Sequence, residues 1–177
     1  MGFSKKVKFF AIFYTLFFAL PTYALEGRGE KIYNRMLNEF VIEVNQKHGL
    51  RYMGGGGSMK GKIKETSLYF SYDRPFSIDE IREVYKGVSS DWLEWINTND
   101  ELTEYLEVAP FGMMNIDITL MHKSFVEGTL DPSKIAVVGR VDDNIYFKIF
   151  DFSVDELKNV SVESYSELMS QGSSRSE

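Results

Sequence analysis

The residues best suited to chemistry lie in and just after a run of consecutive glycines. They are Gly54, Gly55, Gly56 and Gly57, followed by the alternating lysines Lys60, Lys62 and Lys64. Successive backbone N–H groups of glycines can form a nest that binds an anion. Lysines that alternate along an extended segment share one face. Together these features predict a binding site for an anionic surface or partner.

Part of this segment matches the phosphate-binding loop of nucleotide-binding proteins. Gly56, four further residues and Gly61-Lys62 fit the pattern, but Ile63 stands where Ser or Thr would hold magnesium. A phosphate loop also opens a helix, whereas residues 66–72 alternate like a strand. A nucleotide site is therefore not expected. The structural alternative is a mobile hairpin or β-bulge between two strands, with lysines that protect a sheet edge against aggregation.

Histidines, cysteines and carboxylates limit the available reactions. The chain has no cysteine and two histidines, His48 and His122, far apart in sequence. We therefore expect no metal site and no cofactor, and a cysteine nucleophile is excluded. His48 suits the negative end of a helix, and His122 continues the apolar face of a strand. Catalysis by His122 together with carboxylates is a second hypothesis. The chain has 26 acidic residues, and the sequence does not identify which two would form a catalytic pair, because that depends on their separation in space.

Two further groups of residues have both a functional and a structural interpretation. Trp92 and Trp95 could stack on a sugar, but both fall on the apolar stripe of a helix, which favours packing. Asp142-Asp143-Asn144 could bind calcium, but this segment lacks the spacing of a calcium loop. Asp and Asn also favour tight turns through local hydrogen bonds, and a turn is the favoured interpretation.

The first 24 residues have the pattern of a secretory signal. Lysines near the start precede the apolar run 9–20, and Pro21-Thr22-Tyr23-Ala24 follows it. A 12-residue helix spans about 18 Å, well short of the roughly 30 Å of a hydrocarbon core. We therefore expect cleavage after Ala24, a mature chain that begins at Leu25, and a periplasmic or secreted location. An uncleaved membrane anchor is the alternative.

Charge excludes one class of partner. The formal net charge is −6 for the whole chain, and it becomes −9 without the first 24 residues, which carry three lysines and no acid. Such an acidic chain does not favour nucleic-acid binding, and any membrane contact would pass through the signal segment.

Hydrophobic periodicity predicts an α+β fold in a single domain over residues 25–171, with a disordered tail over 172–177. The sequence patterns predict helices over 30–48, 77–96 and about 98–106, and short ones beginning at 153 and spanning 162–169. They predict strands over 50–53, 66–72, 114–122, 135–141 and 145–150. Ser77–Glu80 and Ser153–Glu156 both match a helix capping box. We expect a mostly antiparallel sheet of four or five strands with helices packed on one face.

Several short motifs resemble a family of small exported proteins of unknown function from intracellular bacteria. The resemblance covers roughly residues 33–150. It rests on Gly55-Gly56-Gly57-Ser58-Met59, Ile96-Asn97-Thr98-Asn99-Asp100-Glu101, Tyr105-Leu106, Pro110-Phe111 and Asn115-Ile116. Thr103-Glu104 departs from the Arg-Pro of that pattern. The resemblance implies export and a single domain, and it implies no activity.

These observations favour an exported, non-enzymatic protein that binds another protein or a component of the cell envelope. The glycine segment and its lysines would form the contact. The alternative is a small periplasmic hydrolase or ligand-binding enzyme that uses carboxylates and His122.

Overall fold

The structure is a computed structural model that describes residues 27–59 and 61–170. The predicted signal segment, its cleavage site, Lys60 and the polar tail lie outside the described residues. The helices are α1 (Arg28–His48), α2 (Ile78–Asn97), α3 (Asp100–Thr103), the 3₁₀ turn η1 (Met113–Asn115), α4 (Lys123–Val126) and α5 (Tyr165–Ser170). The strands are β1 (Arg51–Ser58), β2 (Glu65–Tyr72), β3 (Ile116–His122), β4 (Ile135–Val141), β5 (Asn144–Asp151) and β6 (Glu156–Ser164).

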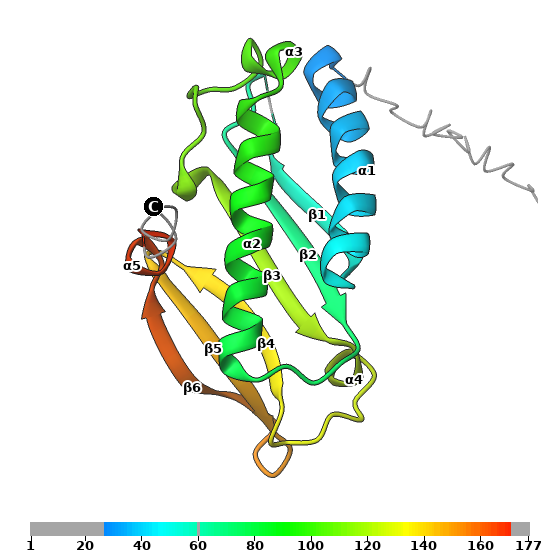
Figure 1. The fold of residues 1–177 in the computed structure, drawn as a ribbon, viewed down its shortest axis with the longest axis vertical. Helices are drawn as coiled ribbons and strands as arrows, with labels where there is room; N and C mark the ends of the chain where they lie inside the picture. Colours follow the sequence, from blue (N-terminus) through cyan, green and yellow to red (C-terminus); the bar gives the residue numbers. More distant parts are fainter. Residues whose placement is uncertain (1–26, 60, 171–177) are drawn as a thin grey trace, which may run out of the picture.

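The described strands form one six-stranded sheet whose spatial order follows the sequence, from β1 to β6 (Figure 1). β2 and β3 run parallel, and every other neighbouring pair is antiparallel. The parallel pair requires a long crossover, which α2 supplies. The predicted α+β class with a mostly antiparallel sheet is confirmed. The predicted count of four or five strands was too low, because β6 was not recognised.

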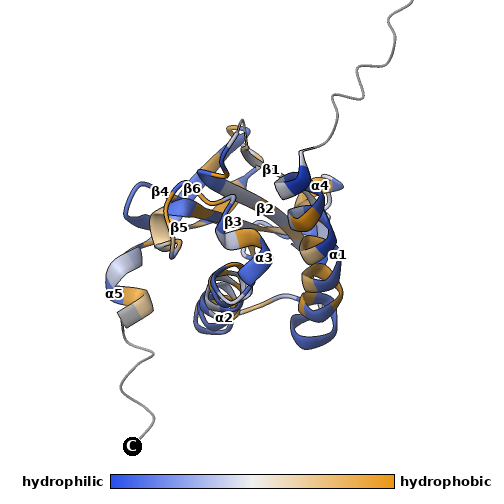
Figure 2. Ribbon diagram, turned by 90° about the horizontal axis from the view of Figure 1, so that it is seen from above, coloured by the Kyte–Doolittle hydropathy of each residue, from blue (hydrophilic) through white to orange (hydrophobic). Residues whose placement is uncertain are grey.

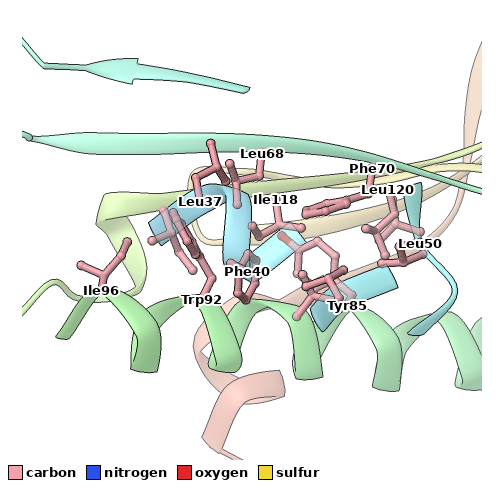
Figure 3. Close-up of a cluster of buried hydrophobic side chains, with 14 of the residues drawn as sticks. Leu37, Phe40, Leu50, Leu68, Phe70, Tyr85, Trp92, Ile96, Ile118 and Leu120 are labelled. Carbon is pink, nitrogen blue, oxygen red and sulfur yellow. The ribbon is translucent and has the colours of Figure 1, made fainter. Parts of the chain in front are cut away.

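α1 and α2 lie side by side on the same face of the sheet (Figure 2). Their buried stripes are the ones that helical periodicity predicts, with Phe40 on α1 and Trp92 on α2 completely buried. Side chains of β2 and β3 alternate, so that Leu68, Phe70 and Leu120 face these helices. The close-up of the core shows these side chains between the helices and the strands (Figure 3).

Local signals explain where the two long helices begin and end. At the start of α2, the Ser77 hydroxyl accepts a hydrogen bond from the N–H of Glu80, and the Glu80 carboxylate accepts one from the N–H of Ser77. This is the predicted capping box. At the end of α1, Gly49 adopts a left-handed conformation and its N–H bonds the carbonyl of Asn45. Both predicted boundaries are confirmed.

The second predicted capping box is wrong. Ser153 donates its N–H and its hydroxyl to the carboxylate of Asp151, which forms a turn rather than a helix start. Asp155 has a φ of 56°, and the chain then returns as β6, paired with β5. β6 lies at the edge of the described sheet, and its apolar residues Leu157, Val160 and Val162 are exposed. The register with β5 also shifts between Asn159 and Ser161, so the segment lacks the regular apolar alternation that marks a strand. Helix begins only at Tyr165.

Candidate functional site

The four glycines lie within β1, not in a hairpin loop. β1 pairs antiparallel with β2 over its whole length, and the register shifts by one residue between Tyr52 and Gly54. Gly54 has a φ of 144°, which L side chains rarely adopt. The predicted bulge is therefore present, whereas the predicted strand end at Met53 was wrong. Among the described strands, β1 has a neighbour on one side only.

The geometry of β1 shows which backbone groups face outward. A Cβ atom added at Gly55 would lie 2.5 Å from the backbone oxygen of Ser67, and one at Gly57 would lie even closer to that of Glu65. The carbonyls of Ser67 and Glu65 therefore point toward β1. In the register of the two strands, Ser67 lies opposite Gly56 and Glu65 lies opposite Ser58. In an antiparallel ladder, residues between such hydrogen-bonded pairs direct their N–H and C=O groups away from the partner strand. Gly55 and Gly57 thus present their backbone groups to the outer edge of the sheet.

A hollow of about 320 Å³ lies between this strand and α1. We call it the α1–β1 groove, and its lining consists of Glu30, Tyr33, Asn34, Leu37, Tyr52, Gly55, Gly56, Gly57 and Met59. The α1 residues recur at helical spacing and so share one side of the helix. Because the glycines have no side chains, nothing on β1 fills the space between the helix and the sheet edge. The groove therefore combines apolar walls with exposed main chain.

The electrostatic character of the groove is simple. Burial raises the pKa of Tyr33, and the neighbouring Tyr52 raises it further. Burial likewise raises the pKa of Tyr52. Both phenols are neutral at physiological pH, so Glu30 supplies the charge in the lining. The groove suits a ligand that is mostly apolar and carries a positive charge near Glu30.

Lys62 and Lys64 do not line this groove. Lys62 donates a hydrogen bond to the backbone oxygen of Glu104. The Nζ of Lys64 lies 3.1 Å from the carboxylate of Glu107. Ile63 between them forms a β-bridge with Leu106, so residues 62–64 are held against the segment after α3. Lys60 lies outside the described residues. Of the predicted contact residues, Gly55, Gly56 and Gly57 line the groove, whereas Gly54, Lys62 and Lys64 do not.

The two histidines have structural surroundings. His122 is buried and packs edge-on against Tyr72, with ring centroids 5.1 Å apart, and its Nδ1 accepts the N–H of Ser124 at the start of α4. Burial lowers its pKa. His48 is in the last turn of α1, with Nε2 3.6 Å from Asp91 on α2. The packing interpretation of His122 matches these contacts.

The strand position of His122 also separates it from the carboxylate of Asp117. Burial raises the pKa of Asp117, which precedes His122 by five residues on β3. Five residues along a strand span about 17 Å and reverse the side-chain direction. Asp117 and His122 therefore cannot act together on one substrate.

The remaining candidate residues also have structural partners. Trp92 donates its indole N–H to the hydroxyl of Thr66 at 3.0 Å, inside the core. Trp95 packs on Phe40, with centroids 5.7 Å apart. The carboxylate of Asp143 accepts hydrogen bonds from Ser164 and Ser166, and it thereby fixes the β4–β5 turn against the start of α5.

Two kinds of feature are absent from the part of the chain that the structure describes. Within residues 27–59 and 61–170, no group of three or more His, Cys, Asp or Glu side chains is arranged to hold a metal ion. No helix in the same ranges is long and apolar enough to cross a membrane.

Comparisons with protein families, with curated proteins and with solved structures found no match. The candidate site therefore rests on this chain's own geometry. Sequence reasoning identified the glycines but missed Glu30, Tyr33, Asn34 and Leu37, which form the helical wall. Their i, i+3, i+4, i+7 spacing was visible in the sequence, but the partner element was not.

Proposed function

We propose that this chain is an exported, non-enzymatic protein that binds another protein or a component of the cell envelope, and that β1 and α1 form the contact surface. Export rests on the signal pattern of residues 1–24. The observation that supports binding is the glycine strand at the sheet edge, open beside a groove with apolar walls. Edge strands are usually blunted by charge, proline or covering elements, so an uncovered edge next to a groove favours recognition.

The contacts of Lys62 and Lys64 favour a contact surface that does not use these two lysines. Lys62 and Lys64 bind acceptors on residues 104–107 of the same chain, and this role stabilises the β1–β2 turn. Gly55 and Gly57 instead present main chain next to α1 on the side where no described strand pairs with β1. We therefore assign recognition to the α1–β1 groove.

Site-specific photo-crosslinking in the native cell tests this proposal. A benzoylphenylalanine at position 34 faces the groove, and one at position 162 lies on β6, at the opposite edge of the described sheet, where Val162 is 48% exposed. We expect a reproducible crosslinked partner from position 34 and none from position 162. Equal crosslinking from both positions, or none from position 34 in a folded and exported chain, would contradict the proposal.

A further inference from the structure

We propose that the partner contributes an extended peptide segment that pairs with the outer edge of β1 as an additional strand. The segment places an apolar side chain in the α1–β1 groove and a basic side chain beside Glu30. This inference rests on the proposed function and specifies its binding mode. It follows from three features of the described residues: outward-facing backbone groups, absent side chains and one negative charge.

The backbone groups have the spacing of a strand. Gly55 and Gly57 are two residues apart, so their outward N–H and C=O groups repeat every 6.8 Å or so, as in any antiparallel ladder. A second polypeptide in extended conformation has donors and acceptors with the same repeat, whereas a folded surface or a sugar does not. Strand addition of this kind supplies affinity through main-chain hydrogen bonds and specificity through pockets for alternate side chains.

The glycines allow the peptide to approach closely on the helix side. A Cβ atom at Gly55 would lie 2.9 Å from the Tyr52 hydroxyl and 3.0 Å from a methyl group of Leu68, so this position faces the core side of the sheet. A peptide side chain on the same side would enter the groove between Tyr33, Leu37 and Met59. The next side chain along the peptide would point to the open face beside Gly56, where nothing lies within 4 Å.

Charge favours a basic peptide over a second copy of this chain. Glu30 is the charged residue in the lining, and the chain itself is acidic, with a net charge of −6. Pairing two copies through β1 would bring two acidic molecules together at this edge. A segment with an apolar residue and a Lys or Arg nearby satisfies both features of the groove.

The first part of the test uses amide exchange in the chain alone. With ¹⁵N-glycine labelling, we expect the amides of Gly55 and Gly57 to exchange rapidly and that of Gly56 to be protected. Of these three N–H groups, that of Gly56 is the one directed toward β2. Gly55 and Gly57 thus serve as the probes, and Gly56 in the same strand is the internal control. Slow exchange at Gly55 and Gly57 together with a dimeric mass would overturn the proposal in favour of self-association.

The second part uses a displayed library of random linear peptides of about ten residues, the length that can pair along β1. A selected peptide should protect Gly55 and Gly57 from exchange. N-methylation of alternate peptide amides should weaken binding about tenfold or more, since each removes a main-chain hydrogen bond, while methylation of the intervening amides should not. Glu30→Lys should weaken binding about tenfold, and Glu43→Lys, the same change on the same helix outside the groove, should not.

Two further outcomes would overturn strand addition. Each can be distinguished from a failure of the proposed function. A partner that crosslinks at position 34 but leaves the Gly55 and Gly57 amides unprotected binds through side chains, so strand addition is wrong and the proposed function is retained. A library that yields no ligand, or ligands insensitive to N-methylation, likewise overturns strand addition. Absence of any partner at position 34 contradicts the proposed function itself.

Discussion

The four glycines of β1 differ in the space that surrounds them. Gly54 needs its positive φ, Gly55 and Gly57 lie against carbonyls of β2, and Gly56 has nothing within 4 Å of an added Cβ. Gly54, Gly55 and Gly57 therefore require glycine for conformational or steric reasons, whereas Gly56 does not. Gly56 provides a natural control for its neighbours.

Alanine at Gly55 or Gly57 should destabilise the protein. The methyl group would collide with the backbone of β2, which cannot move without breaking the ladder, and we expect the free energy of unfolding to fall by about 1–3 kcal/mol. Gly56→Ala should leave it unchanged or raise it by up to about 1 kcal/mol. Urea unfolding monitored by tryptophan fluorescence measures all three variants. Equal effects at the three positions would mean that β1 lacks this close approach.

The glycine run also shows a limit of sequence reasoning. Strands are recognised by alternating side chains, and glycine has none, so Gly54–Gly57 carries no period-2 signal. Its membership of β1 is decided by hydrogen bonds to β2, which a local pattern does not contain. Tyr33 and Leu37 were correctly predicted to face the core, but the groove beside them depends on where β1 lies.

An ion pair fixes α2 to the last strand. Arg82 donates from Nε and Nη2 to the two carboxylate oxygens of Glu163 on β6, at 2.7 and 2.6 Å. The Arg82 guanidinium lowers the pKa of Glu163 below its ordinary value of 4.5. A carboxylate with a lowered pKa in the folded state contributes stability above its unfolded pKa, and this contribution is lost as the pH falls through the folded value.

Glu163→Gln should therefore lower the free energy of unfolding by about 1 kcal/mol at pH 7, since it removes a charge-assisted bidentate contact. The difference from the parent chain should shrink as the pH falls below about 4.5 and vanish below the folded pKa. Asp79→Asn removes the other carboxylate that contacts Arg82, but Asp79 is 89% exposed and its loss should have little effect. Unfolding curves from pH 3 to pH 7 test this, and a difference that is independent of pH would contradict it.

The two capping-box motifs explain why some elements were predictable and one was not. Ser77 and Glu80 precede a strong apolar helical stripe, so local signal and tertiary packing agree. Ser153 and Glu156 have the same residue types, but the hydroxyl of Ser153 bonds Asp151 instead. The segment that follows is ordered by pairing with β5, a tertiary contact that overrides the local motif.

Export is the prediction that concerns the entire chain. Intact-mass measurement of the protein recovered from its native cell should give a chain that begins at Leu25, because Thr22 and Ala24 provide the small residues of a cleavage site. A chain that retains Met1 would show that the segment is an anchor. Replacing Ala24 with a bulky residue should block cleavage and leave the precursor mass.

The parallel pair at the centre of the sheet governs the order in which the chain can fold. β2 and β3 are neighbours, but residues 73–115 separate them, whereas β4, β5 and β6 are joined by short turns. Closing the long loop costs more conformational entropy than forming local hairpins, so the β2–β3 pairing is the slow, non-local step. A chain that emerges from a secretion channel N-terminus first would display the unpaired side of β2 until β3 arrives. An exported chain would therefore expose this strand during translocation, when a chaperone could protect it.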